Sequence, residues 1–417
     1  MIEHVNLNKL KLKLNYSKDK SAYNRYFSFI RFILWKITGL SPWKFESSGI
    51  FHESKINSSD KNDVCSVSYV GSCYNILVFL AIDSFAVYRL LDQSFNRNYP
   101  GPILSLIIVK FLFIALLCAS LIPLMYIIWQ KIIITVNNEF ENVDEILGKC
   151  TDYEIKKSHL NNVIFIVNLF TKICLILVLD LFYYSTERVF YEIIPSIISS
   201  GVIIQYATQL NRVNKRFKSI NLAILKLGDF KISASLTQVS SVTQTVLSRE
   251  SIIYEIENIK CAYIKLCEMS ENIADFYGIP ILIAIFSFAV RSIFTVYFTI
   301  LSLVKIQLEN IVWYQNGIRI LWIIFLFTVL TSSVTTITKQ NKKLARIINS
   351  LTDRYTMDEK IKKNLAKFSN DLWHLKVELT ACDIIPLDRT LLAIITGTIA
   401  TYLVIGVQFA LSTRSRT

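Results

Sequence analysis

Residues 401–409 read TYLVIGVQF, with five mostly apolar residues between a Thr-Tyr pair and a Gln-Phe pair. They lie in an apolar run over 390–411, and about 20 such residues suffice to cross a bilayer as a helix. A glutamine in hydrocarbon costs free energy unless it has a hydrogen-bond partner. Gln408 therefore raises the question of which environment this last helix faces.

The composition indicates an integral membrane protein. Of the 417 residues, 53% are hydrophobic and only 18% are charged, below the roughly 25% typical of soluble domains. Apolar runs predict seven membrane spans, at 65–88, 102–129, 161–184, 189–209, 277–303, 318–338 and 390–411. The fourth is unusually polar for a membrane span, because it carries Glu192 and Gln205 in addition to Pro195, and a half-buried helix is the alternative.

Basic residues are distributed unevenly about these spans. The segments 1–64, 130–160, 210–272 and 339–389 hold 35 Lys and Arg residues, and the alternate segments hold 7. Because cytoplasmic loops carry the excess of Lys and Arg, we predict a cytosolic N-terminus and an extracellular C-terminus. The net charge of +13 is then explained by the anionic cytoplasmic leaflet, without nucleic acid. The polar N-terminal sequence also predicts no cleaved signal peptide.

The segments outside the spans have helical patterns of their own. Within the cytosolic N-terminal segment 1–64, residues 24–40 are apolar with embedded basic residues, which predicts an interfacial or re-entrant helix or an additional shallow span. The segments 210–276 and 339–389 contain amphipathic stretches, so we expect cytoplasmic anchor helices that pack together. Residues 412–417 are expected to form a short extracellular tail.

The last span has one small, polar face. Small residues at helical spacing let membrane helices approach closely, but several copies of such a face also suit the wall of a water-filled pore. The place of Gln408, about three residues from the outer end, favours the pore. The face comprises Thr390, Gly397, Thr401, Val404, Gln408 and Ser412.

Charged residues within the predicted spans mark a second region of interest. Each is expensive in lipid and is expected to face a partner or a wet cavity, and an Asp83–Lys110 ion pair is one structural interpretation. The other is a cavity open to the outside, where aromatic residues gather at the outer ends of spans three to six. The candidate ligand-pocket residues are Lys172, Asp180, Tyr183, Tyr184, Arg291, Tyr297 and Trp322.

Patterns of catalysis and metal binding are missing from the sequence. It has no phosphate-binding Gly-rich loop, no HExxH and no GxSxG motif, and no pair of its 4 His residues has metal-ligand spacing. None of the 8 Cys falls in a predicted outer segment, so no disulfide framework is expected. We therefore expect no enzyme, no metal and no cofactor.

The sequence resembles the insect gustatory receptors. That family's signature is Thr-Tyr, five hydrophobic residues and Gln-Phe, which 401–409 match without a break, and 378–392, 263–282 and 216–224 also look like the family. Asp383 stands where the family often has Gly. The resemblance covers most of the chain, and the signature lies in the last of seven predicted spans.

The resemblance implies an all-α membrane protein with seven transmembrane helices, acting as a tetrameric, ligand-gated, non-selective cation channel. Span seven would line a central pore, with Gln408 and Phe409 at its constriction and Val404 on its wall. Thr401 and Tyr402 would position the pore helix. Cytoplasmic helical extensions would form an anchor, and a small tastant would bind in the outer half of spans one to six.

Other classes of membrane protein fit the sequence less well. A G-protein-coupled receptor would place the N-terminus outside, against the charge distribution, and a transporter would favour internal repeats and broken helices. A structural membrane protein would leave the outer charged and aromatic residues unexplained. We expect a homo- or hetero-tetramer in the plasma membrane of sensory neurons, detecting bitter or other non-sugar compounds, with a sugar or internal nutrient receptor as the alternative.

Overall fold

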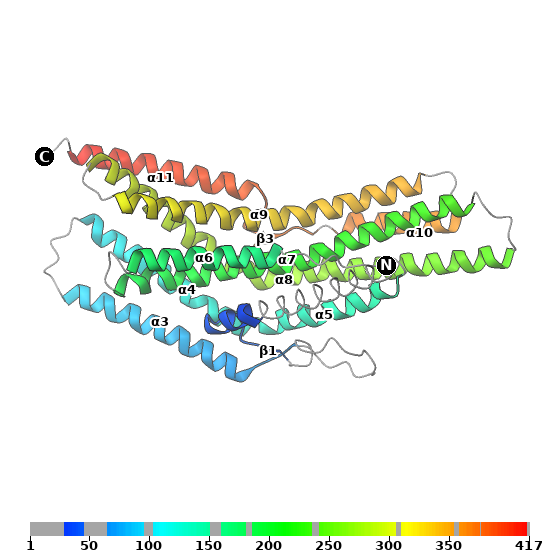
Figure 1. Ribbon diagram of the computed structural model, residues 1–417, viewed down its shortest axis with the longest axis horizontal. Coiled ribbons are helices and arrows are strands. Elements are labelled where there is room, and N and C mark those ends of the chain that lie inside the picture. Colours follow the sequence, from blue (N-terminus) through cyan, green and yellow to red (C-terminus); the bar gives the residue numbers. More distant parts are fainter. Residues whose placement is uncertain are drawn as a thin grey trace, which may run out of the picture.

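The protein is an elongated bundle of helices (Figure 1). The computed structural model describes residues 29–45, 65–95, 103–150, 160–180, 186–235, 242–305, 310–353, 358–375 and 377–414. Each predicted span falls on one of seven helices: α3 (Tyr69–Phe95), α4 (Ile103–Ile128), α6 (Leu160–Asp180), α7 (Thr186–Ser235), α8 (Val242–Lys305), α9 (Asn310–Thr352) and α11 (Thr390–Arg414). The remaining elements are α5 (Gln130–Gly148), α10 (Glu359–His374) and the short strands β1 (Lys44–Phe45), β2 (Cys65–Ser66), β3 (Thr380–Ala381) and β4 (Ile385–Pro386).

The described helices differ in how fully they meet the length and apolarity of a membrane span. Two shorter apolar helices, Leu160–Leu175 and Thr390–Thr401, lie in α6 and α11. Four helices of the described chain are long and apolar enough by themselves, over Tyr69–Tyr88, Ile193–Leu227, Arg249–Ile293 and Asn316–Thr352. The bent pair of α4 and α5 adds a fifth if the two helices are taken as one span.

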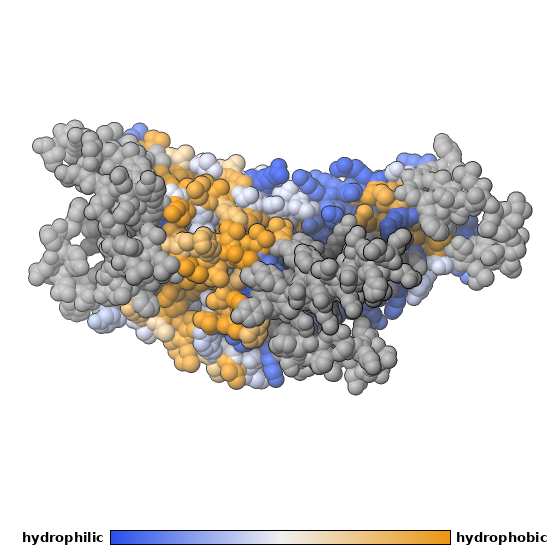
Figure 2. Space-filling view, viewed as in Figure 1, coloured by the Kyte–Doolittle hydropathy of each residue, from blue (hydrophilic) through white to orange (hydrophobic). Residues whose placement is uncertain are grey.

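Three helices are much longer than a bilayer is thick. The 50, 64 and 43 residues of α7, α8 and α9 correspond to about 75, 96 and 65 Å at 1.5 Å per residue, against about 30 Å of hydrocarbon. Figure 2 shows hydrophobic residues over one half of the visible face and hydrophilic residues over the other. The long helices therefore run from an apolar half into a polar half.

Helix α7 is the buried centre of the bundle. It packs against α4, α6, α8 and α9, and 78% of its most apolar window is buried. Gln205 is satisfied inside this core, because its Nε2 donates to the Leu40 carbonyl at 2.8 Å and its Oε1 accepts from Tyr126 Oη at 2.8 Å. Gln205, one of the polar residues that make this span weak on hydropathy, thus binds other parts of the chain instead of lipid.

Helix α5 was not predicted from the sequence. It follows α4 after a 59° bend at Trp129 and packs against α8. Its Phe140 ring lies 4.1 Å from the guanidinium carbon of Arg212 and 4.4 Å from that of Arg216. Arg216 also donates from Nε to Asp144 Oδ1 at 2.8 Å. Cation–π contacts and an ion pair therefore join α5 to α7.

Residues 29–45 of the N-terminal segment pack into the bundle. Residues 29–37 are helical, within the predicted 24–40, and Leu40 is fully buried. Two glycines make room for the residues that follow this helix, Leu40 and Pro42. A Cβ at Gly201 would lie 2.4 Å from Leu40 Cδ1, and a Cβ at Gly71 would lie 1.9 Å from the carbonyl oxygen of Pro42. Any side chain at these positions would disturb the inserted segment.

Helix α10 covers the polar ends of α8 and α9 (Figure 1). Its N-cap is Asp358, whose carboxylate accepts from the Lys360 amide at 2.9 Å. Oδ2 of the same carboxylate forms an ion pair with Arg249 Nη1 of α8 at 3.2 Å, and Asp371 forms another with Lys260 of α8. The apolar residues Ile361, Leu365 and Phe368 face inward. The amphipathic stretch predicted over 339–389 is thus divided between the end of α9 and α10.

Candidate pore face and ligand-binding region

A tight hairpin leads the chain into α11. Strands β3 and β4 pair in antiparallel register, and the turn is closed by the Ile384 amide donating to the Ala381 carbonyl at 3.1 Å. Its central residues, Cys382 and Asp383, both have positive φ, of 55° and 56°, as a type I′ turn requires. Glycine adopts this conformation without strain, and aspartate is one of the few other residues that tolerate it.

The first turn of α11 is capped by Asp388. Its Oδ1 accepts from the Thr390 backbone amide at 2.9 Å and from the Thr390 hydroxyl at 2.6 Å. A carboxylate at this position satisfies an amide that has no partner within the helix, and it interacts favourably with the helix dipole. The cap therefore fixes where α11 begins.

The two faces of α11 have different environments. Leu391 and Ile395 are buried against α8 and α9, as the helical phasing predicts. Thr401, Val404 and Gln408 are exposed, and a Cβ added at Gly397 would meet nothing within 4 Å. The small, polar face is thus left uncovered by the rest of the chain.

The polar groups on this helix differ in how they are satisfied. Thr401 donates its hydroxyl to the Gly397 carbonyl at 2.9 Å, as membrane-helix threonines commonly do. Gln408 makes no hydrogen bond with the described part of the chain. Ile394 and Ile405 are also exposed, so the uncovered surface is wider than the polar stripe. Tyr402 and Phe409 lie in α11, but their side chains are outside the described residues.

Two candidate pocket residues, Lys172 and Trp322, are in direct contact. Lys172 of α6 is buried, and its Nζ donates to Ser196 Oγ of α7 and lies 3.6 Å from the centroid of the Trp322 ring of α9. The Trp322 Nε1 donates to Asn168 Oδ1 at 3.0 Å. A buried cation is thereby held by an aromatic face and a hydroxyl.

Helix α8 completes this cluster. The Phe288 ring meets the Trp322 ring edge-on at 5.3 Å between centroids. The sequence reading missed Asn168, Ser196 and Phe288. Asn168 was within reach of sequence reasoning, because it lies one helical turn before Lys172 and so shares its face.

The structure describes the remaining predicted pocket residues and the predicted Asp83–Lys110 pair only in part. Arg291 lies on α8, one turn after Phe288, and is half-buried. The side chains of Asp180 and Tyr297, and residues Tyr183 and Tyr184, are outside the described residues. Asp83 of α3 accepts a hydrogen bond from Ser120 of α4 at 2.7 Å. Lys110, its predicted partner in an ion pair, has its side chain outside the described residues.

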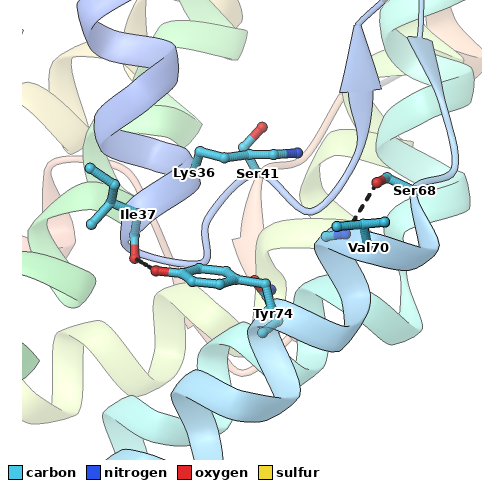
Figure 3. Close-up of a pocket in the computed structure, with 8 residues that line it drawn as sticks. Lys36, Ile37, Ser41, Ser68, Val70 and Tyr74 are labelled. Carbon is cyan, nitrogen blue, oxygen red and sulfur yellow. Dashed lines mark hydrogen bonds between the residues drawn. The ribbon is translucent and has the colours of Figure 1, made fainter.

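A cavity that the sequence did not predict lies at the N-terminal end of α3 (Figure 3). It has a volume of about 300 Å³ and lies between the helix over 29–37 and the first turns of α3. Tyr74 joins the two walls, because its hydroxyl donates to the Ile37 carbonyl at 2.7 Å. The cavity is lined by Lys36, Ile37, Ser41, Ser68, Val70, Gly71, Tyr74 and Asn75.

Sequence comparison assigns the protein to a family. A family model described as 7tm chemosensory receptor matches residues 23–413. The chain therefore belongs to the 7tm chemosensory receptor family, which is a family of receptors and not of enzymes, and the predicted resemblance is confirmed. A Drosophila melanogaster protein named gustatory receptor 28b is 37% identical over 90 residues, which is 22% of this chain and 19% of that relative. The match thus spans about a fifth of the relative's length.

Solved structures share the fold. The insect olfactory receptor OR5 from Machilis hrabei matches with a TM-score of 0.60 and 13% identity, over 92% of this chain and 98% of OR5. OR5 in complex with eugenol matches with the same score and identity, over 93% and 98%. At this identity the likeness extends to the arrangement of helices, and the functional residues must be argued from this chain.

Proposed function

We propose that the protein is a gustatory receptor subunit that forms a ligand-gated, non-selective cation channel. Four subunits, identical or mixed with related receptors, would surround a central pore in the plasma membrane of sensory neurons. The family assignment supports a chemosensory role. The uncovered polar face of α11 supports the pore.

That face is the observation that carries the proposal. Gln408 and Thr401 are exposed within a helix whose opposite side is packed on α8 and α9. An amide facing hydrocarbon costs free energy, whereas in a ring of four subunits it faces water and passing ions. Gln408 and Phe409 would form the constriction, with Val404 and Thr401 on the wall and Tyr402 positioning the helix.

The long helices would assemble the channel. The polar ends of α7, α8 and α9, together with α10, fall within the segments 210–276 and 339–389 predicted as a cytoplasmic anchor. The excess of basic residues in these segments supports their cytosolic side. In this arrangement the N-terminus is cytosolic and residues 412–417 end outside.

The ligand would bind in the outer part of the bundle, near Lys172 and Trp322. A buried cation and an indole face offer a small molecule both polar and aromatic contacts, and the related fold of OR5 holds eugenol. Arg291, Asp180, Tyr183, Tyr184 and Tyr297 are the further candidates. Bitter or other non-sugar compounds are the proposed ligands, with sugars or internal nutrients as the alternative.

Whole-cell recording tests this proposal. The chain is expressed in non-neuronal cells, alone and with related receptors, and a panel of tastants is applied while G-protein signalling is blocked. We expect agonist-evoked cation currents that persist under the block. Currents that disappear under the block would show that the receptor signals through a G protein and would contradict the channel.

A further inference from the structure

The cavity between the N-terminal helix and α3 lies where an apolar span begins. Tyr69 starts the membrane-span candidate of α3, and Val70, one residue later, lines the cavity and is 82% exposed. Only 17% of that span's most apolar window is buried within the chain, so most of it is free to face lipid. If α3 crosses the bilayer from Tyr69 onward, the cavity lies at the level of the headgroups.

The helix over 29–37 provides the second apolar surface. Phe29, Ile33 and Ile37 are exposed and recur every four residues, which places them on one face. An exposed apolar stripe on a helix with basic residues is typical of a helix lying in the membrane interface. Ile37 continues this stripe to the mouth of the cavity, so acyl chains can follow both of its walls.

The polar groups of the cavity are incompletely satisfied by the protein. Lys36 extends from its helix across the space (Figure 3) and donates to the Trp43 carbonyl at 2.7 Å. Among the described residues no carboxylate pairs with it, and burial lowers the pKa of its ammonium group. A lysine has two further donors, and a negatively charged ligand would offset the cost of its desolvation.

Two neutral groups in the lining also lack partners. Ser41 and Asn75 are buried, and neither Ser41 Oγ nor Asn75 Oδ1 has a hydrogen-bond partner in the described structure. The Asn75 amide orientation is fixed, because Nδ2 donates to two carbonyls, of Gly39 at 2.7 Å and Pro123 at 3.0 Å. Oδ1 is therefore an acceptor that still needs a donor, and buried groups of this kind usually find one.

We propose that this cavity binds the headgroup of an anionic phospholipid from the leaflet on the N-terminal side. The phosphate meets Lys36, and the headgroup lies beside the wall formed by Ser41 and Asn75. The acyl chains lie along Val70 and Ile37. A volume of about 300 Å³ suits a headgroup and its glycerol, and the apolar walls distinguish the site from one for a soluble anion. This proposal goes beyond channel activity and does not depend on it.

Lipid titration of the purified full-length protein in detergent tests the proposal, with binding followed by native mass spectrometry. The probes are phosphatidylinositol, phosphatidylserine, phosphatidylcholine and soluble glycerophosphate. We expect the anionic lipids to bind about fivefold more tightly than phosphatidylcholine, as one lysine near an anionic headgroup contributes. Glycerophosphate is expected not to compete. Competition by glycerophosphate would identify a soluble phosphate site, and equal binding of all lipids would identify a nonspecific annulus; either result overturns the proposal.

Matched variants locate the site. Lys36→Gln is expected to abolish the preference for anionic lipid, and Lys36→Arg to retain it. Lys367→Gln, on the exposed surface of α10, makes the same charge change elsewhere and is expected to leave the preference intact. Val70→Glu adds a negative charge at an exposed wall and is expected to abolish the preference even if Lys36→Gln folds poorly. If either Lys36→Gln or Val70→Glu keeps the full preference, the lipid binds elsewhere.

Discussion

Gly71 is the position where one added methyl group tests how the N-terminal segment is docked. In Gly71→Ala the new Cβ would lie 1.9 Å from the Pro42 carbonyl oxygen and 2.7 Å from its carbonyl carbon. Both are backbone atoms, so no side-chain rotation relieves the contact. Either α3 or the segment over 40–43 must move by more than about 1 Å, because Cβ contacts below 3.0 Å are essentially never seen.

The expected cost follows from three contributions. Overpacking costs about 1–3 kcal/mol, and alanine offsets about 1 kcal/mol of this by its higher helix propensity. Movement of the segment also strains the Gln205–Leu40 and Asn75–Gly39 hydrogen bonds, and losing one costs about 1–3 kcal/mol. The middle of each range gives a net destabilisation of about 3 kcal/mol.

The assay is thermal unfolding of the detergent-solubilised protein. Unfolding entropy of about 2.1 cal/mol/K per residue gives about 0.9 kcal/mol/K for 417 residues, so Tm is expected to fall by about 3 °C. Gly148→Ala is the control, because a Cβ there meets nothing within 4 Å. If Gly71→Ala melts at the same temperature as the wild type and the control, residues 40–43 do not dock against α3 as described.

Three other substitutions test the ligand-binding region, the anchor and the cap of α11. Trp322→Phe removes the donor to Asn168 and is expected to raise the half-maximal agonist concentration about tenfold, unlike Trp373→Phe at a 72% exposed position. Phe368→Ala removes a fully buried ring and is expected to cost about 3–5 kcal/mol; an unchanged Tm contradicts the packing. Hydrogen bonds from the Thr390 hydroxyl and then its amide lower the pKa of Asp388, so the cap stabilises above the unfolded pKa of about 4 and is lost as the pH falls through the folded pKa. Asp388→Asn keeps an oxygen that can cap the helix but does not titrate, so its Tm is expected to fall less at acid pH than that of the wild type, and equal acid sensitivity refutes this role.

The helices at the predicted spans could be predicted because most of them contain a contiguous apolar run, which is local information. The two faces of α11 were predictable for the same reason, since helical phasing alone separates Leu391 from Thr401. Helix α5 was missed because its polar sequence resembles a loop between spans. It packs against α8, which begins 94 positions after α5 ends.

The docked N-terminal segment and the outer cluster depend on contacts between distant parts of the chain. Gly201 and Gly71 make room for residues that are 161 and 29 positions away, respectively, and a lone glycine in a helix does not indicate what approaches it. Lys172 and Trp322 were each singled out, as a charge and an aromatic residue within spans. Their contact required the packing of α6 against α9, which one sequence does not specify.

Block by thiol reagents tests most directly whether the polar face of α11 lines the ion pathway. Cells expressing Gln408→Cys or Thr401→Cys are recorded during agonist application, before and after a membrane-impermeant methanethiosulfonate. The wild type controls for native cysteines, and Ile395→Cys provides a buried position on the opposite face. The account predicts block of the current at 408 and 401 and none at 395. Unblocked currents in both exposed-face variants, with normal surface expression, would contradict a pore lined by α11.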